Sequence, residues 1–168
     1  MSNDDRIVAK IAARAADPAR RADDETPPQP IPLSDASFLD RIESELGFAL
    51  PGLLKRLCLE VGDGGYGPGC GMFGAASGHW MSDEPFTMAE LYRCNHTGNW
   101  PDRLVPICDW GCAIWSCIDC TDSSFPMVVS DPNEGPVVFI SEKIGFAAWI
   151  EAWADGVDLV ARRSGFWK

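Results

Sequence analysis

Hydrophobic residues recur every three or four positions through the first half of the chain, and this spacing predicts helices. The predicted helices cover residues 5–16, a segment from Ser34 or Asp35 to Gly47, residues 51–61, and a segment that begins at Thr87. Pro51 suits a first helical position, and Gly62 suits a left-handed cap after the third helix. Glu90 follows Thr87 at the spacing of a capping box, which marks the start of the fourth helix.

From Leu104 the pattern changes to short runs of β-branched and aromatic residues, which predict strands. The predicted strands are residues 104–107, 112–118, 127–130 and 137–140. Turn-forming residues at 131–135 predict a hairpin between the last two. A closing helix, capped at Ser141 and ended by Gly156, carries four large apolar residues on one face: Phe146, Trp149, Ile150 and Trp153. This order predicts an α+β fold, in which helices pack against a largely antiparallel sheet of four or more strands.

Prolines separate the first predicted helix from the rest of the chain. They lie at Pro18, Pro27, Pro28, Pro30 and Pro32. Such a segment forms a semi-rigid, extended linker. We therefore predict an N-terminal helix with a proline-rich arm over residues 1–32, and a single α+β domain over residues 33–168. The sequence leaves open whether the arm docks on its own domain or on a neighbouring copy, and it leaves the oligomeric state open.

A glycine-rich segment directly follows the third predicted helix. Gly62, Gly64, Gly65, Gly67 and Gly69 alternate there with Asp63, Tyr66 and Pro68. Phosphate-binding loops precede a helix, because the N–H groups at the helix N-terminus contact the anion. Here the glycines follow a helix, and the Lys-Ser/Thr pair of such loops is absent. The segment is therefore not predicted to bind phosphate.

Three short motifs occur in a characteristic order. They are the helix start Leu50-Pro51-Gly52-Leu53-Leu54-Lys55-Arg56-Leu57 with the glycine segment behind it, the segment Leu104-Val105-Pro106-Ile107-Cys108-Asp109-Trp110-Gly111-Cys112, and the helix segment Phe146-Ala147-Ala148-Trp149-Ile150. Together, from about Phe38 to Gly156, they resemble the SUKH superfamily. Its members include bacterial immunity proteins of polymorphic toxin systems and Smi/Knr-type regulators of yeast cell-wall assembly. The resemblance implies a Smi/Knr-like fold and a protein that binds a cognate toxin domain, often a nuclease.

The acidic residues of the chain belong mainly to the predicted domain. The formal net charge is −11, and residues 57–161 contain fifteen acids but only three bases, Arg93, Arg103 and Lys143. This field disfavours nucleic acid and anionic membranes as partners, and it attracts a basic protein. An acidic surface also keeps a protein soluble, so the charge alone leaves both interpretations open.

The chain is expected to be cytoplasmic. Its N-terminus opens with acids and lacks the apolar region of a signal peptide. No apolar run approaches the length that spans a bilayer. Seven cysteines, an odd number, then indicate reduced thiols.

The cysteines are not predicted to form a metal centre. Cys108, Cys112, Cys117 and Cys120 lie within thirteen residues, and four thiolates can hold zinc. If residues 112–118 form a strand, however, Cys112 and Cys117 project to opposite faces and cannot share a tetrahedral site. Cys117 and Cys120 have the spacing of a redox pair, but they follow a strand instead of starting a helix. We expect no metal, no cofactor and functionally silent thiols.

No catalytic residue is predicted. His79 and His96 are the only histidines, and no motif supplies the group that would orient a Cys–His pair. The signature motifs of hydrolases, metalloproteases and dinucleotide-binding enzymes are absent. The sequence therefore predicts a protein that is not an enzyme, and a thiol- or metal-dependent enzyme is the least favoured alternative.

Tryptophans beside acids supply the candidates for partner binding. Trp80, Trp100 and Trp110 each have an acid nearby in a predicted loop. Such pairs suit an interface hot spot, where the ring buries area and the acid meets Lys or Arg. Each ring could instead cover the core. The candidate partner-binding residues are Asp63, Tyr66, Trp80, Asp83, Glu84, Trp100, Asp109, Trp110, Asp119 and Asp122.

Two functional hypotheses follow. The first is a non-enzymatic, acidic protein-binding module that acts as an immunity protein against a basic toxin domain; the immunity role comes from the resemblance. The second is a regulatory or scaffold protein of the same family without a toxin partner. A neighbouring reading frame for a large secreted protein with a variable C-terminal domain would favour the first.

Overall fold

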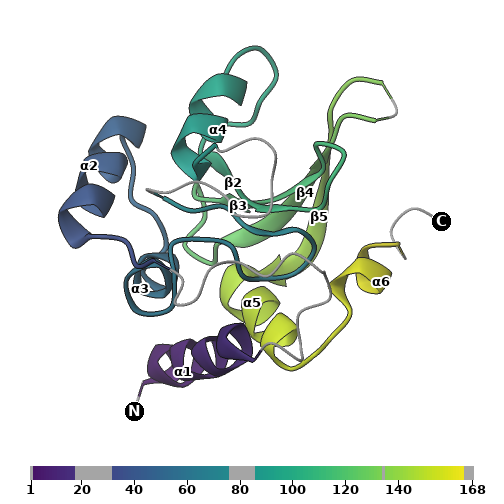
Figure 1. The fold of residues 1–168 in the computed structure, drawn as a ribbon. Coiled ribbons are helices and arrows are strands. Elements are labelled where there is room, and N and C mark those ends of the chain that lie inside the picture. The colour runs from purple at the N-terminus through teal and green to yellow at the C-terminus, as the bar shows by residue number, and fades with distance from the viewer. Residues whose placement is uncertain (1, 18–31, 76–85, 134, 165–168) are drawn as a thin grey trace.

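The computed structural model describes residues 2–17, 32–75, 86–133 and 135–164, without the side chains of residues 162–164 (Figure 1). Its first half contains α1 (Asn3–Ala16), α2 (Ala36–Leu46), α3 (Gly52–Glu60), β1 (Gly71–Met72) and α4 (Met88–Asn95). Its second half contains β2 (Leu104–Asp109), β3 (Trp115–Asp119), β4 (Pro126–Asp131), β5 (Val138–Gly145), α5 (Phe146–Ala154) and α6 (Leu159–Ser164). The predicted helical first half and strand-rich second half are confirmed.

One antiparallel sheet forms the middle layer of the fold. Its five strands lie in the order β1-β2-β3-β4-β5, and each neighbouring pair is antiparallel. Figure 1 shows α4 on one side of this layer and α5 with α1 on the other. The hairpin predicted at residues 131–135 joins β4 to β5. The predicted α+β class is therefore confirmed.

The hydrophobic core is one cluster formed by residues of the sheet and of helices α1 to α5. Its most deeply buried side chains include Ile11, Leu57, Ile118, Phe146 and Trp149, each at most 1% exposed. Burial of side chains of this size stabilises the fold by about 1.5–3 kcal/mol each. In the described part of the chain, no helix is both long enough and apolar enough to span a membrane.

Helix α2 begins and ends where its sequence predicts, and α4 begins where its sequence predicts. The Asp35 carboxylate accepts hydrogen bonds from the N–H groups of Ser37 and Phe38 at the start of α2, and Gly47 ends this helix at a φ of 78°. At the start of α4, Thr87 and Glu90 form the predicted capping box. These caps involve residues within a single turn, which is why the local sequence identifies them.

The third helix departs from its prediction at both ends. Pro51 is the N-cap residue and stands one position before the first helical residue. Gly62 does not adopt the expected left-handed conformation, because the N–H groups of Val61 and Gly62 both donate to the Leu57 carbonyl. The chain then turns toward Pro32, whose carbonyl accepts a hydrogen bond from the Asp63 N–H at 2.7 Å.

The strand predicted at residues 112–118 begins only at Trp115. Gly111, Cys112 and Ala113 all have positive φ and form a tight turn, which the Trp110 N–H closes by donating to the Ile114 carbonyl. Cys112 therefore lies in a turn, and the argument that placed it on one strand with Cys117 was wrong in its premise. The turn forms because Asp109 pairs with Trp115 across a β2–β3 hairpin.

The last strand is longer than predicted, and Ser141 does not cap the following helix. Instead, β5 continues to Gly145, which is the N-cap of α5. Pairing with β4 holds this extension, because Ser141 lies opposite Val128 and Gly145 opposite Pro126. The extra residues form a bulge with Lys143 at a φ of 53°. Glu142 in the bulge is buried, and it accepts hydrogen bonds from Ser116 Oγ and Trp149 Nε1.

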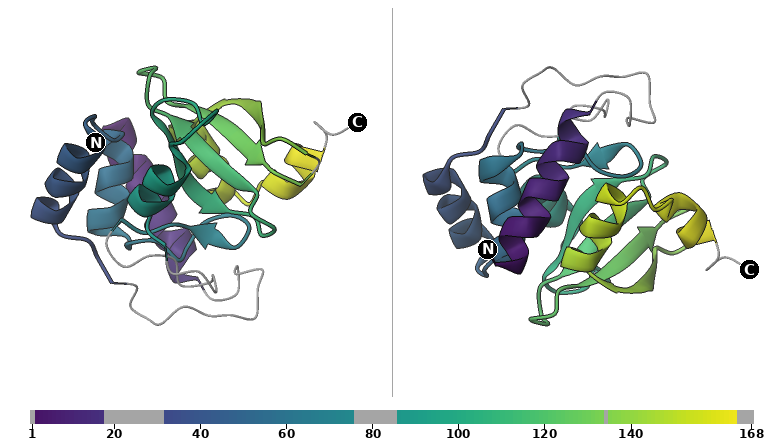
Figure 2. Two further views of the ribbon diagram at one scale, coloured as in Figure 1. Left: turned by 90° about the horizontal axis from the view of Figure 1, so that it is seen from above. Right: turned by 90° about the horizontal axis from the view of Figure 1, so that it is seen from below.

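The N-terminal helix docks on its own chain. Its apolar residues Ile7, Val8, Ile11 and Ala15 join the same core as α3 and α5. The view from below in Figure 2 shows α1 lying alongside α5. Prolines 18, 27, 28 and 30 of the predicted arm lie outside the described residues.

Candidate partner-binding surface

The glycine segment that follows α3 is packed into the fold. Gly64, Gly67 and Gly69 all have positive φ, which glycine adopts without steric cost. A Cβ on Gly64 would lie 2.5 Å from the backbone nitrogen of Gly74, and a Cβ on Gly69 would lie 2.6 Å from the ring of Trp110. The glycines are thus required by close contacts with backbone and ring atoms. The glycine segment therefore serves to pack the chain closely against neighbouring parts of the fold.

Two candidate residues of this segment have buried side chains. Asp63 is 1% exposed, and its Oδ1 accepts a hydrogen bond from the Ala75 N–H at 2.7 Å. Tyr66 is 5% exposed, its ring lies 6.2 Å from that of Trp153, and burial raises its pKa well above the usual value. Both side chains therefore hold the segment against the rest of the molecule and are not presented to a partner.

A cluster of half-buried rings lies on the sheet face opposite α5. Trp100 contacts Trp115 and Phe139, with ring centroids 6.1 and 5.2 Å apart. We call these three residues the aromatic patch. Trp100 is fixed by a hydrogen bond from its Nε1 to the Leu104 carbonyl at 2.8 Å. The neighbouring Ser116 points the other way, toward Glu142 and α5, which places Trp115 on the face away from α5.

The register of three strands brings the aromatic patch together. Trp115 of β3 lies opposite Ser130 of β4, and Ser130 lies opposite Phe139 of β5. Trp100 comes from the loop after α4. Of these rings, only Trp100 was a candidate from the sequence. The alternation Trp115–Cys117–Asp119 indicates a shared face for Trp115 and Asp119, but the sequence does not show which face α5 covers.

Two candidate acids lie at one end of the sheet. Asp119 ends β3 on the same face as Trp115, and Asp122 follows in the turn before β4. Each carboxylate accepts a backbone hydrogen bond, from the Thr121 N–H at 2.8 Å and the Ser124 N–H at 2.7 Å. The bond from Ser124 lowers the pKa of Asp122, so this exposed group stays charged at neutral pH. We call Asp119 and Asp122 the sheet-end acids.

Two other candidates lie at the opposite end of the same strands. Asp109 ends β2, and its carboxylate accepts a hydrogen bond from the Gly111 N–H at 2.8 Å. The Trp110 ring is half-buried over Gly69, and its Nε1 donates to Ser116 Oγ at 2.9 Å. A β2 of six residues separates these groups from the sheet-end acids by about 16 Å. The candidates that the structure describes therefore do not form one compact site.

Three candidates lie outside the described residues: Trp80, Asp83 and Glu84.

Three of the cysteines lie in surroundings that disfavour the thiolate. Burial raises the pKa of Cys58 and of Cys120 to about 12, and it raises the pKa of Cys117 further. Cys94 and Cys112 are exposed. Across the described ranges, no disulfide forms, and no three His, Cys, Asp or Glu side chains are grouped as a metal site.

A pocket of about 350 Å³ lies between α2, α4 and the start of β2, and it contains His96. The His96 ring stacks on Tyr92, and its Nε2 lies 4.0 Å from an oxygen of Asp102. A histidine beside a carboxylate is one part of a hydrolytic site. The described lining of this pocket contains no Ser, Thr or Cys that His96 could activate.

The chain was compared with protein families and with known proteins. The model of the family described as SMI1 / KNR4 (SUKH-1) matches residues 33–162. The matched region contains α2 to α5, the whole sheet and most of α6, and it leaves out α1. No curated protein and no solved structure matched the chain.

Proposed function

The chain belongs to the SMI1/KNR4 (SUKH-1) family, and from that premise we propose that it is a non-enzymatic protein-binding module. In this proposal it acts as a cytoplasmic immunity protein, which binds and neutralises a basic toxin domain. The aromatic patch is the observation that carries the proposal. Trp100, Trp115 and Phe139 lie together, half-buried, on a sheet face that α5 does not cover.

The physical properties of the patch suit a protein interface. Tryptophan and other aromatic residues bury a large area with few rotatable bonds and dominate interface hot spots. Hydrogen bonding already fixes Trp100, so little side-chain entropy is lost on binding. Asp109, which lies opposite Trp115 across the β2–β3 pairing, can meet a lysine or arginine of the partner.

The acidic composition favours a basic partner. Residues 57–161 contain fifteen acids and three bases. A toxin that cleaves nucleic acid needs a basic surface to bind its substrate. An acidic protein that covers such a surface both attracts it over a distance and blocks its substrate.

The second candidate is a regulatory or scaffold protein of the same family without a toxin partner. It rests on the same patch, so only the partner distinguishes the two functions. A thiol-dependent enzyme is less favoured, because burial raises the pKa of Cys117 and Cys120 and thus suppresses the reactive thiolate.

The test uses the full chain and the C-terminal domain of a large secreted protein encoded by the neighbouring reading frame. We expect the chain to bind this domain and to protect cells that express it. Trp115→Ala and Phe139→Ala should each raise the dissociation rate at least about tenfold, because a buried anchor is lost. Circular dichroism first establishes that the variants fold.

Val157→Ala provides the matched control, since Val157 is an exposed apolar residue between α5 and α6. It should leave the dissociation rate unchanged. Equal rates for the wild type, the control and both patch variants would contradict the proposed surface. A domain that neither binds the chain nor is neutralised by it would contradict the immunity function.

A further inference from the structure

Helix α1 packs on α3 and α5 and contributes Ile7, Val8, Ile11 and Ala15 to the hydrophobic core. It begins with its own capping box, in which the Asp5 N–H donates to Ser2 Oγ and the Ser2 N–H donates to the Asp5 carboxylate. The family match begins at residue 33, so α1 is an addition to the architecture that the family model covers. Residues 17–35 connect it to α2. We call the surface of α3 and α5 that holds it the α1-docking face.

The apolar contact follows one stripe of α1. Ile7, Val8, Ile11 and Ala15 recur at helical spacing and are all at most 6% exposed. The other residues of the helix are polar residues or alanines, and all of them are exposed or half-exposed, which is typical of an amphipathic helix in a groove. The docking face therefore binds α1 as proteins bind amphipathic helices from a partner.

Charges on both sides fix the direction and register of α1. At its N-terminal end Asp5 meets Arg56 of α3, with Oδ1 2.9 Å from the guanidinium nitrogen. Arg6 pairs with Glu151 of α5. One turn further, Lys10 Nζ lies 3.0 Å from Glu151 and 2.6 Å from Asp155. A helix that fits this face thus carries an acid in its first turn and bases one and five positions later.

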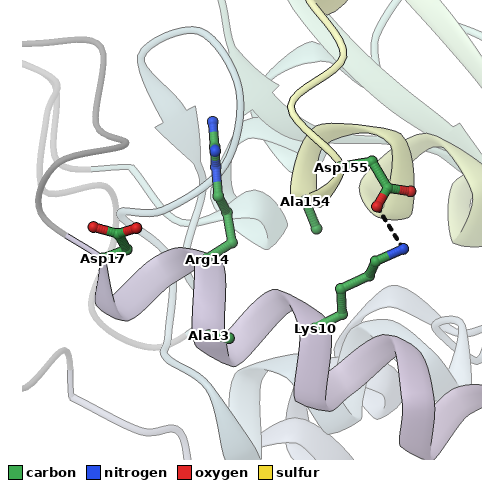
Figure 3. A pocket seen from close by; sticks show the side chains of 6 residues that line it. All are labelled: Lys10, Ala13, Arg14, Asp17, Ala154 and Asp155. Atoms are coloured by element: carbon green, nitrogen blue, oxygen red, sulfur yellow. Dashed lines mark ion pairs between the residues drawn. The ribbon is translucent and has the colours of Figure 1, made fainter.

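The contact is incompletely filled at the C-terminal end of α1. A pocket of about 430 Å³ opens there, lined by Lys10, Ala13, Arg14, Asp17, Ala154 and Asp155 (Figure 3). The small side chains of Ala13 and Ala154 leave space between the two helices. Figure 3 shows Arg14 pointing away from the Lys10–Asp155 pair. Among the described residues, its buried Nε has no hydrogen-bond partner, and its guanidinium lies 5.6 Å from the centroid of the Trp153 ring.

We propose that the α1-docking face is a binding site for a basic amphipathic helix of another protein, and that α1 occupies this site in the free chain. The incoming helix has the pattern of α1: an apolar stripe, an acid that meets Arg56 and bases that meet Glu151 and Asp155. This inference does not depend on the immunity function.

Tethering explains why α1 fills the site by default. Residues 17–35 join α1 covalently to α2, so α1 docks within its own chain, at an effective concentration on the order of millimolar. A free helix at micromolar concentration is therefore excluded unless α1 is weakened. A partner that also binds elsewhere on the molecule gains the same tethering advantage and can displace α1.

The test uses the full chain and a fluorescent peptide with the sequence of residues 2–17. The variant Arg6→Glu/Lys10→Glu places acids on α1 opposite Glu151 and Asp155, so it should release α1. We expect the peptide to bind this variant at least about tenfold more tightly than it binds the wild type. Unchanged binding, with hydrogen exchange showing that α1 has opened, would overturn the proposal.

A charge swap separates recognition from general loosening. Glu151→Lys in the otherwise unchanged chain should release α1, because Arg6 and Lys10 of α1 then face a base. A peptide in which both bases are replaced by glutamate should bind this variant, and the wild-type peptide should not. If the peptide that carries both glutamates does not bind, the proposed charge pattern of the incoming helix is wrong. The chain could instead form a concentration-dependent dimer that the peptide dissociates. In that case α1 of a second copy would fill the site, and the proposal that a different protein binds there would be wrong.

A second measurement covers the case in which the variant does not fold. A protease site placed between residues 20 and 30 of the otherwise unchanged chain allows α1 to be cut free. We expect the cut helix to exchange with labelled peptide while the remainder keeps its circular dichroism. Unfolding of the remainder when α1 leaves would overturn the proposal, because α1 would then be an integral part of the core.

Discussion

At the scale of single residues, the glycine segment shows that a family motif can be structural. Gly64 and Gly98 both have positive φ, but they differ in their surroundings. A Cβ on Gly64 would meet backbone atoms of Gly74 and Met72 within 3 Å, whereas a Cβ on Gly98 would meet nothing within 4 Å. A substitution at Gly98 therefore measures the cost of backbone strain alone, whereas a substitution at Gly64 measures strain together with steric crowding.

We expect Gly98→Ala to lower the free energy of unfolding by about 1–2 kcal/mol, the cost of a left-handed alanine. Gly64→Ala should lower it by about 1–3 kcal/mol more, because backbone atoms must move. Urea unfolding of both variants measures the difference. Equal losses would show that the segment is not tightly packed in solution.

The cysteines allow a second prediction at this scale. Cys94 and Cys112 are exposed, whereas Cys58 and Cys117 are buried and have raised pKa values. At pH 8 a thiol reagent should modify the buried pair on the order of 100-fold more slowly than the exposed pair, because local opening must come first. Mass spectrometry of timed samples identifies the modified residues, and unfolding in urea should make all four reactive. Equal rates in the folded protein would contradict the burial.

At the scale of elements, the contact between α1 and α5 depends on Glu151. Hydrogen bonds from Arg6 and Lys10 lower the pKa of Glu151 to about 2, from an ordinary value of 4.5. A carboxylate with a lowered pKa stabilises the folded state fully above its unfolded pKa. Its contribution is lost as the pH falls from about 4.5 toward 2.

We therefore expect Glu151→Gln to be less stable than the wild type at pH 7, and expect this difference to shrink toward zero near pH 2. Urea midpoints measured between pH 7 and pH 2 give the comparison. Asp40→Asn, on the exposed side of α2, is the matched control and should leave the midpoint nearly unchanged. A difference for Glu151→Gln that is the same at every pH would rule out the ion pairs as its cause.

At the scale of the whole molecule, the charge distribution predicts how fast a basic partner arrives. Charges at the rim of an interface act mainly on the association rate, and salt screens them. Asp119 lies on the same sheet face as the aromatic patch, at the other end of β3 from Trp115, so the sheet-end acids can guide such a partner through long-range attraction.

Asp119→Asn/Asp122→Asn removes both charges and keeps side-chain oxygens that can accept the bonds from Thr121 and Ser124. We expect the association rate to fall several-fold at low salt and to differ little from the wild type near 1 M salt, where the Debye length is about 3 Å. Asp40→Asn again serves as the control. An association rate that is independent of salt for the wild type would mean that the acidic surface serves only solubility.

The sequence by itself determined the features that depend on neighbouring residues. Asp35 and Gly47 mark the two ends of α2, and Thr87 with Glu90 marks the start of α4, each through contacts within one turn. After β4, the Asp131 carboxylate accepts a hydrogen bond from the Asn133 N–H, a local turn contact that the sequence indicates. Together with the family motifs, they were enough to predict the α+β fold.

Only the tertiary structure decided which side chains reach the surface together. Asp63 and Tyr66 are buried because distant segments pack over the glycine segment. Trp100, Trp115 and Phe139 meet because strand pairing brings together residues far apart in the chain. Docking of α1 likewise depends on Glu151 and Asp155, more than 140 residues away. Local patterns fix how a segment folds, whereas register and packing between segments fix what it contacts.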